Sequence, residues 1–231
     1  MCWRRPELSN FLIAIDGPAG SGKSTIAKLL SERLGFNHLD TGAMYRAVAL
    51  YLDSKGLSPE DDLTEELDEI DMDYIDGELY LNGEKVHEEE IRSARAGQLA
   101  SSFATVAKVR EKLTQLQRKI CENGNFVVEG RDIGTVVLPH AQVKIFLTAS
   151  FEERVRRRLE ELKRKGVNFS FEEVAKQIEE RDRRDSSRDL APLRPAEDAI
   201  VIDTTGKSIE QVLKEVIEAV NRREKDETVR C

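Results

Sequence analysis

The run from Gly17 to Thr25, Gly-Pro-Ala-Gly-Ser-Gly-Lys-Ser-Thr, carries residue types that bind polyphosphate. It matches Gly-x-x-x-x-Gly-Lys-[Ser/Thr], in which glycines let successive backbone N–H groups face phosphate oxygens. Lys23 is expected to reach the β- and γ-phosphates of a nucleotide, and the Ser24 hydroxyl to bind Mg²⁺. The run therefore predicts an ATP or GTP site without fixing the reaction. The predicted ATP-binding residues are Gly17, Pro18, Ala19, Gly20, Ser21, Gly22, Lys23, Ser24 and Thr25.

Two other segments place a hydroxyl or guanidinium groups where a second anion could bind. The segment from Thr41 to Arg46 follows a short strand pattern and opens a helix. Arg131 lies just past the end of another strand, at the sheet edge where ligands of α/β proteins bind. Structural roles remain open for each: Arg46 as a solvated helix residue, Arg131 as the ion-pair partner of Asp132, and Tyr45 as a core residue.

The segment 154–194 is rich in arginine, with 13 basic and 9 acidic residues. Charge runs of this kind are usually solvated helix faces. As a group they also suit a lid that closes on polyphosphate. Arg181, Asp185 and Arg188 have the spacing i, i+4 and i+7, which predicts one shared helix face. Two guanidiniums and a carboxylate on that face could hold a phosphate or sugar hydroxyls.

The choice among nucleotide-using proteins depends on what accompanies the loop. A regulatory GTPase usually carries an Asn-Lys-x-Asp motif that recognises guanine, and the sequence contains no such motif. A motor ATPase usually has a longer apolar strand that ends in Asp-Glu. A kinase needs a second anion site and arginines that close over phosphates, and both are predicted here. His38, His87 and His140 lie in no motif, so surface or structural roles are expected. Because no general base is predicted, the acceptor is expected to be a phosphate, whose oxygen is already ionised, rather than an alcohol, which must lose a proton.

The elements that must position these residues follow an α/β pattern. Because strands alternate with helices, a parallel sheet covered on both faces is expected. Asp76-Gly77 and Asn82-Gly83 are hairpin signals between β-prone residues, so a small antiparallel sheet is expected within the acidic region 59–90. The predicted strands are 11–15, 36–40, 126–128, 143–147 and 199–202. The predicted helices are 24–34, 43–55, 91–121 with a break near Val106, 151–165, 171–185 and 208–221.

Composition narrows the class of protein. The 231 residues carry a formal charge of −8. This charge argues against a protein that binds along nucleic acid and against one that binds a membrane surface. No window approaches 18 continuous apolar residues, and the first residues lack the apolar core of a secretory signal. Three widely spaced cysteines favour a reducing cytoplasm over a disulfide framework. Residues 59–90 hold fifteen acidic residues and one lysine, so the rest of the chain is net basic.

Together these motifs make the chain resemble the bacterial-type cytidylate kinases, from about Phe11 to Val220. The resemblance implies an α/β, three-layer P-loop kinase fold with a parallel core sheet, an inserted small α+β monophosphate-binding domain and a short helical lid. The first of its motifs is shared with many kinases, whereas the others, in this order, are specific. The segments that carry it are 15–25, 40–46, 129–135 and 181–185, extended by 189–193 and 196–199.

The resemblance also implies a domain division. The division comprises an N-terminal extension (1–10), a P-loop core (11–58 and 106–221) with a lid at about 154–185, an inserted nucleoside monophosphate-binding domain (59–105) and a charged, frayed tail (222–231). We expect a cytoplasmic monomer that binds neither nucleic acid nor membrane.

The implied reaction is transfer of the ATP γ-phosphate to CMP or dCMP, giving CDP or dCDP and ADP, with Mg²⁺ as the cofactor. Glu129, where some relatives carry aspartate, is given a Mg²⁺-water or structural role. The catalytic residues that the resemblance implies are Lys23, Arg131, Arg158 and Arg181. The implied CMP-binding residues are Thr41, Tyr45, Arg46 and Arg131 for the phosphate, Ser101, Arg110, Asp132 and Arg188 for the base, and Arg181 and Asp185 for the ribose.

The base assignment is chemically sensible. Cytosine offers an N4 amino donor that Asp132 accepts, and its N3 and O2 acceptors suit an arginine and a serine hydroxyl. Uracil has a hydrogen-bond acceptor at position 4 and a donor at N3, the reverse of cytosine. Buried polar groups of the protein would then be left unpaired. A related kinase that prefers UMP and a non-catalytic P-loop binding module remain the alternatives.

Overall fold

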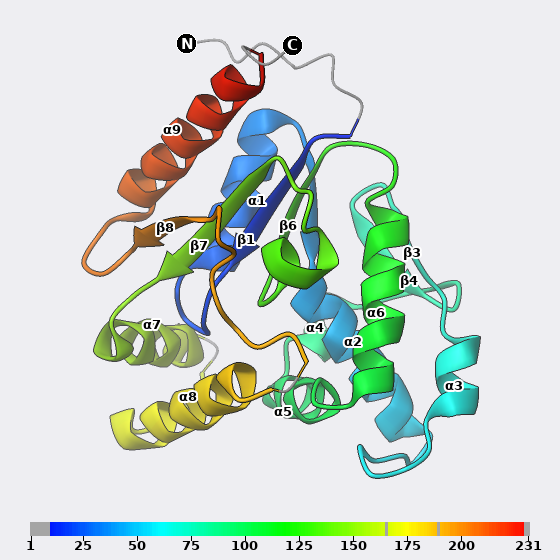
Figure 1. Cartoon of the computed structure of the whole chain (residues 1–231). Coiled ribbons are helices and arrows are strands. Elements are labelled where there is room, and N and C mark those ends of the chain that lie inside the picture. Colours follow the sequence, from blue (N-terminus) through cyan, green and yellow to red (C-terminus); the bar gives the residue numbers. More distant parts are fainter. Residues whose placement is uncertain (1–9, 165, 189, 229–231) are drawn as a thin grey trace. The chain divides into compact units, whose positions relative to one another are not determined.

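The computed structural model describes residues 10–164, 166–188 and 190–228 (Figure 1). They group into two compact units. The first contains the described residues up to His38 and from Asn125 onward, and the second contains Leu39–Gly124. Most of the predicted extension 1–10, Asp189 of the motif extension and the last three residues of the predicted tail lie outside the described residues.

A five-stranded sheet forms the core, and all of its strands except β2 lie wholly in the first unit. Its strand order is β2-β6-β1-β7-β8. β1 pairs in parallel with β6 and β7, and β7 with β8, which confirms the predicted parallel sheet. Strands covered on both faces are nearly continuous apolar runs, and Ile13, Ala14 and Ile15 are fully buried. The strands are β1 (Leu12–Asp16), β2 (Asn37–Asp40), β6 (Phe126–Gly130), β7 (Val143–Thr148) and β8 (Ile200–Asp203).

Two helices cover one face of this sheet, α1 (Lys23–Leu34) and α9 (Ile209–Thr228) (Figure 1). Ile26 and Leu30 of α1 and Val216 of α9 share one buried apolar cluster with the strands. α9 continues past the predicted helix end at 221 to Thr228, because the Arg, Glu and Lys residues of this stretch are good helix formers.

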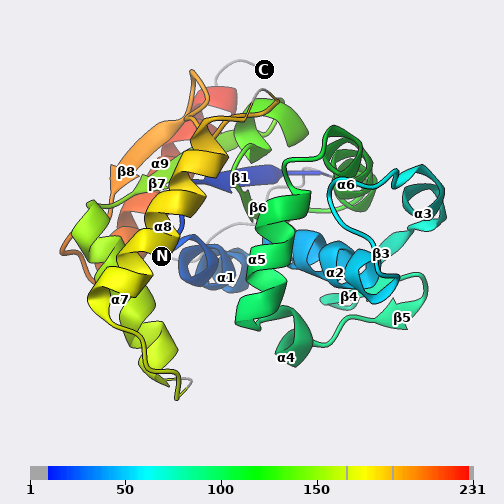
Figure 2. The ribbon, with the colours of Figure 1, turned by 90° about the horizontal axis from the view of Figure 1, so that it is seen from below.

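The helices of the predicted lid segment form a pair within the first unit. α7 (Phe151–Arg164) and α8 (Phe171–Ser186) lie side by side in both views (Figures 1 and 2). Val155 of α7 and Val174 of α8 are fully buried in a small apolar cluster of their own. A capping box of Ser170 and Glu173 begins α8, with each side chain bonded to the other's backbone N–H.

A short π-helical turn, η1 (Ile133–Val137), follows β6 and was not predicted. It begins after Asp132, whose carbonyl oxygen accepts the backbone N–H groups of Val136 and Val137 at 2.8 and 3.1 Å. This turn therefore carries the chain from β6 with Arg131 and Asp132 at its entrance.

The second unit combines helices with a three-stranded antiparallel sheet, β3-β4-β5. Both hairpin predictions are confirmed, because Asp76-Gly77 and Asn82-Gly83 turn the chain with positive φ. The predicted helix break is also confirmed at Val106, between α5 and α6. The elements are α2 (Thr41–Ser54), α3 (Thr64–Glu69), β3 (Met72–Ile75), β4 (Glu78–Leu81), β5 (Glu84–Lys85), α4 (Glu88–Ile91), α5 (Ala94–Phe103) and α6 (Ala107–Ile120).

This unit is larger than the inserted segment expected at 59–105. It reaches from 39 to 124 because α2 packs against α5, and α6 contacts α3 and β3. The helices α3 and α4 are short and acidic and were not predicted. In the described part of the chain, no helix is both long and apolar enough to cross a membrane.

Candidate active site

The predicted phosphate-binding loop joins the end of β1 to the start of α1. Gly17 has φ of 151°, and a Cβ there would lie 2.0 Å from the carbonyl oxygen of Leu147, so no side chain fits. Gly22 precedes α1 with φ of 92°, and no side chain caps the helix at that position. The first backbone N–H groups of α1 are thus suited to an anion, as the motif predicts.

Lys23 is folded back over its own loop. Its ammonium donates to the carbonyl oxygen of Pro18 at 2.7 Å and lies 3.4 Å from Oγ of Ser21. The residue is only 6% exposed. Burial and the nearby guanidinium of Arg131 hold the pKa of Lys23 well below its usual value. An added anion beside this ammonium would offset both effects, which is the electrostatic setting expected of a phosphate-binding lysine.

Ser24, Glu129 and His38 form a chain of polar contacts across the first unit. Oγ of Ser24 donates to Oε2 of Glu129 at 2.7 Å, and Nε2 of His38 lies 3.0 Å from Oε1 of the same carboxylate. Glu129 is the fourth residue of β6 and is 3% exposed. A buried carboxylate is therefore fixed beside the hydroxyl that the motif assigns to Mg²⁺. No sequence pattern predicted the contact with His38.

Arg154 of α7 contacts the phosphate-binding loop directly. Its Nη1 donates to the carbonyl oxygen of Ala19 at 3.2 Å and to Asp182 of α8 at 2.5 Å. A Cβ on Gly20 would come within 3.0 Å of Arg154, so the helix and the loop are in close contact. This arginine braces the loop against the two helices of the lid segment.

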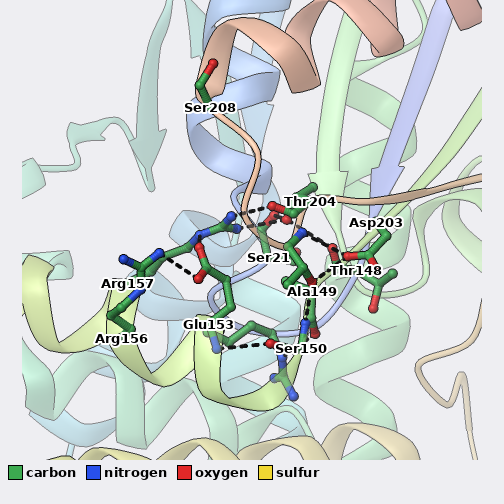
Figure 3. A network of polar contacts seen from close by, with 12 residues as sticks. Ser21, Thr148, Ala149, Ser150, Glu153, Arg156, Arg157, Asp203, Thr204 and Ser208 are labelled. Atoms are coloured by element: carbon green, nitrogen blue, oxygen red, sulfur yellow. Dashed lines mark hydrogen bonds and ion pairs between the residues drawn. The ribbon is translucent and has the colours of Figure 1, made fainter.

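Arg157, one turn further along α7, reaches Thr204 in the loop after β8 (Figure 3). Its guanidinium donates to Oγ1 and to the carbonyl oxygen of Thr204 at 2.8 and 2.6 Å. The buried Thr204 hydroxyl also lies 3.2 Å from the carbonyl oxygen of Ser21 and 3.0 Å from that of Thr148. The loop is thus held at Ser21 as well as at Ala19.

Arg158 was predicted to be a catalytic residue, and it lies in the predicted lid. In the structure it forms an ion pair with Glu161 on the exposed side of α7, at 2.7 Å. The described contacts therefore do not bring Arg158 to the phosphate-binding loop, and its role stays a prediction.

Three arginines surround one buried carboxylate, Asp185 of α8. Nε of Arg131 donates to it at 2.9 Å, Arg188 forms a close ion pair with it, and Nε of Arg181 lies 4.0 Å away. Burial would raise the pKa of Asp185, but the three guanidiniums outweigh burial and hold the pKa below its usual value. Three positive charges against one negative charge leave this cluster cationic, as an anionic ligand requires.

Two details of this cluster correct the sequence predictions. Arg188 is not on the same helix face as Arg181 and Asp185, because α8 ends at Ser186 and Arg188 reaches back from the segment beyond. Arg131 is paired with Asp185 rather than with its neighbour Asp132. Asp132 is 5% exposed and stands at the start of η1.

In the second unit, Arg46 is held in place by Asp40. One carboxylate oxygen of Asp40 accepts the Ala43 N–H at 3.1 Å and caps α2, while the other accepts from Nη2 of Arg46 at 2.8 Å. A Cβ on Gly42 would lie 2.9 Å from the guanidinium. Arg46 is therefore an ordered side chain at the helix N-terminus, next to the buried Thr41, and not a solvated helix residue.

Tyr45, Arg110 and Ser101 belong to the same unit. The guanidinium of Arg110 lies 5.9 Å from the ring centre of the half-buried Tyr45, and its Nη1 lies 3.5 Å from the carbonyl oxygen of Ala104. Ser101 is 7% exposed, and its hydroxyl has no hydrogen-bond partner among the residues that the structure describes. A buried unsatisfied hydroxyl is costly, so its presence favours a ligand that completes it.

Comparison with known proteins decides the family. The model of the family described as cytidylate kinase matches residues 13–222. Curated cytidylate kinases from Pseudothermotoga lettingae, Thermotoga neapolitana and Thermotoga maritima are 66%, 58% and 55% identical over 97%, 93% and 92% of this chain. The matches cover 100%, 99% and 98% of those proteins. The chain belongs to the cytidylate kinase family.

Membership of the cytidylate kinase family confirms the resemblance carried by the four motifs. A solved structure of an uncharacterized protein from Eubacterium ventriosum has a TM-score of 0.53 at 14% identity, covering 91% of this chain and 98% of that one. At that identity the likeness concerns the fold alone. The parallel sheet with flanking helices agrees with the predicted α/β P-loop kinase fold.

Sequence reasoning missed several residues that shape the site of this cytidylate kinase family member. Asp40 lies in the segment 40–46, but no role was predicted for it. Thr204 and His38 lie in no motif. No role was predicted for Asp16 either. The contacts of Thr204, His38 and Asp16 join segments that are distant in the sequence, for which spacing along one helix or strand gives no signal. Asp40 contacts Ala43 and Arg46, only three and six residues away, and its position before the helix start is the signal that could have found it.

Proposed function

We propose that this chain transfers the γ-phosphate of ATP to CMP or dCMP, giving ADP and CDP or dCDP, in pyrimidine nucleotide metabolism. The observation that carries the proposal is the cationic cluster of Arg131, Arg181 and Arg188 around Asp185 in the unit that holds the phosphate-binding loop. Phosphoryl transfer between two phosphate groups needs excess positive charge to offset their repulsion, and needs no general base.

The donor is held by the loop from Gly17 to Thr25. Backbone N–H groups and the N-terminus of α1 bind the phosphate oxygens. In the presence of phosphates, Lys23 exchanges its contact with the Pro18 carbonyl for phosphate oxygens. Transfer is direct and in-line, with no covalent enzyme intermediate, and Arg131, Arg181 and Arg158 stabilise the charge on the transferred group together with Lys23.

The residues present fit Mg²⁺. This ion prefers hard oxygen ligands, and the Ser24 hydroxyl and the Glu129 carboxylate supply them on two adjacent elements. When bound with ATP, Mg²⁺ offsets charge on the β- and γ-phosphate oxygens. Ser24 holds the ion, and Glu129 orients the Ser24 hydroxyl.

The acceptor-binding residues that we propose are those that the family resemblance implies. Arg131, Arg46, Thr41 and Tyr45 serve its phosphate, and Arg181 and Asp185 its ribose. Asp132 and Arg188 together with Ser101 and Arg110 serve cytosine. The unsatisfied Ser101 hydroxyl supports this assignment, because a base oxygen or nitrogen would satisfy it. The second unit is then the nucleoside monophosphate-binding domain, and α7 and α8 form the lid.

We also propose that the enzyme works as a cytoplasmic monomer that binds neither nucleic acid nor membrane. Its substrates are small anions, and the net charge of −8 opposes a polyanionic partner. Sedimentation at several protein concentrations would test the monomer, and a mass of two chains would contradict it.

A turnover assay tests the reaction. The purified chain is incubated with ATP, Mg²⁺ and one of CMP, dCMP, UMP or AMP, and ADP formation is measured. We expect CDP and dCDP with little UDP, and no turnover with any monophosphate would contradict the proposal.

In Asp132→Asn, discrimination between CMP and UMP should fall while ATP binding is kept. Unchanged discrimination would remove Asp132 from the base site.

A further inference from the structure

Asp16 joins two parts of the first unit that are more than a hundred residues apart in the sequence. It is the last residue of β1 and immediately precedes Gly17, where the phosphate-binding loop begins. Its Oδ1 accepts the backbone N–H of Ile133 at 2.9 Å, and its Oδ2 accepts that of Gly134 at 2.8 Å. Both oxygens are thus used by consecutive peptide groups at the start of η1.

Only a carboxylate supplies two acceptor oxygens to two adjacent N–H groups. An asparagine in the same place would offer one oxygen and turn its NH₂ group toward an N–H. A Cβ on Gly134 would be in ordinary contact with Oδ2 of Asp16, at 3.5 Å, so the two backbone hydrogen bonds are what join Asp16 to the turn.

This arrangement carries an energetic cost. Asp16 is 4% exposed, and burial raises its pKa from 3.8 to about 6 against the effect of the two backbone hydrogen bonds. Of the nearby charges, Asp132 raises the pKa further and Lys23 lowers it. A buried carboxylate that costs stability, and whose oxygens serve only to fix a turn, favours a role in positioning that turn.

We propose that Asp16 is a positioning residue for phosphoryl transfer: it fixes the turn that begins at Arg131 and Asp132 against the phosphate-binding loop. Arg131 then stays beside the loop, and Asp132 keeps the orientation in which it reads the acceptor base. The inference rests on the proposed function, because those roles of Arg131 and Asp132 belong to it.

Asp16→Asn and Asp61→Asn make a matched pair for the test. Asp61 also accepts from a backbone N–H and a second donor, both of Ser58, but it is exposed in a loop of the second unit. For Asp16→Asn we expect kcat/KM with CMP to fall by roughly tenfold to a hundredfold. The ratio of kcat/KM for CMP to that for UMP should fall too. The affinity for ATP, titrated calorimetrically without acceptor, should match that of the wild type. Asp61→Asn should match the wild type throughout.

A second variant keeps the proposal testable if Asp16→Asn does not fold. Asp16→Glu keeps the negative charge and both acceptor oxygens, but the added methylene displaces them from the N–H groups of Ile133 and Gly134, and the same selective loss of CMP discrimination is expected. Discrimination unchanged in a folded variant, or ATP and CMP affected equally, would overturn the positioning role. A wild-type enzyme that turns over no monophosphate would instead refute the proposed function, so the two failures are distinguishable.

Discussion

The Ser24 hydroxyl donates a 2.7 Å hydrogen bond to the buried carboxylate of Glu129. Ser24 begins the first turn of α1, and Glu129 lies near the end of β6, so a helix start and a strand end are joined at the proposed Mg²⁺ site. His38 lies 3.0 Å from the other oxygen of the same carboxylate. The hydroxyl is thereby fixed before any ion is bound.

Glu129→Gln keeps an acceptor for Ser24 but removes the negative charge. We expect kcat to fall about tenfold and the Mg²⁺ concentration for half-maximal activity to rise, because an ion near the site loses a favourable charge. Titration of activity with Mg²⁺ is the measurement. Glu122→Gln, at an exposed glutamate after α6, is the control. An unchanged Mg²⁺ dependence would remove Glu129 from the ion's surroundings.

Lys23→Met separates activity from stability. The ammonium is buried, and burial together with the guanidinium of Arg131 holds the pKa of Lys23 below its usual value, so the charge is disfavoured in the protein without nucleotide. Without the ammonium, turnover should fall at least roughly a hundredfold, since a charged group at the transferred phosphoryl is lost. The melting temperature without nucleotide should not decrease. A large loss of stability with activity retained would contradict both expectations.

Ser101→Ala should change stability and affinity in opposite directions. The buried hydroxyl lacks a partner in the free protein, so its removal should raise stability by about 1 kcal/mol. The same removal should raise KM for CMP roughly tenfold, since one hydrogen bond to the base is lost. Thermal melts and steady-state kinetics give the two readings. Ser102→Ala, one residue further along α5, is the control, and an unchanged KM for CMP in Ser101→Ala would exclude the base contact.

Asp185→Asn removes the carboxylate that three arginines share. Because one partner of a buried ion pair is lost, we expect a loss of about 3–5 kcal/mol at neutral pH. The pKa of Asp185 is lowered in the folded state, so its contribution is present above the unfolded value of 3.8 and disappears as pH falls through the folded value. Denaturant unfolding at pH 7 and at pH 3 should show the difference between wild type and variant shrinking in acid.

Asp198→Asn serves as the control for that experiment. Asp198 pairs with Lys144 at 3.0 Å, but its side chain is 54% exposed. A surface pair of this kind contributes about 0–1 kcal/mol. Equal losses of stability in the two variants would show that the buried ion pairs of Asp185 contribute no more than an exposed pair.

The pH dependence of stability expected from Asp16 runs in the opposite direction. Its pKa is raised to about 6 in the folded state, so its stabilising contribution is complete below 3.8 and is lost as pH rises through 6. Between pH 4 and pH 7 the wild type should lose about 2 kcal/mol relative to Asp16→Asn, because each pKa unit between 3.8 and about 6 corresponds to about 1.4 kcal/mol and part of the effect is already lost at pH 4. Chemical unfolding of both proteins across that range measures the change. A constant difference would mean that Asp16 ionises normally.

The positions of the strands and most helices follow from local pattern. The apolar run before Asp16, the glycines of the phosphate-binding loop and the Asp-Gly and Asn-Gly turns act over a few residues, and each predicted its element. The short helices α3 and α4 and the π-helical turn η1 were missed, because six residues or fewer give too little periodicity.

The sequence alone determined the family, the parallel α/β core and the chemical class of the site, because glycine, lysine, serine and arginine at fixed spacing carry that chemistry within short segments. The tertiary structure decided which partner each charge takes. Arg131 pairs with Asp185 and not with Asp132, Glu129 contacts Ser24 and His38, and Asp16 holds the turn after β6. These partners are brought together by the order of parallel strands, and separation along the chain does not reveal them.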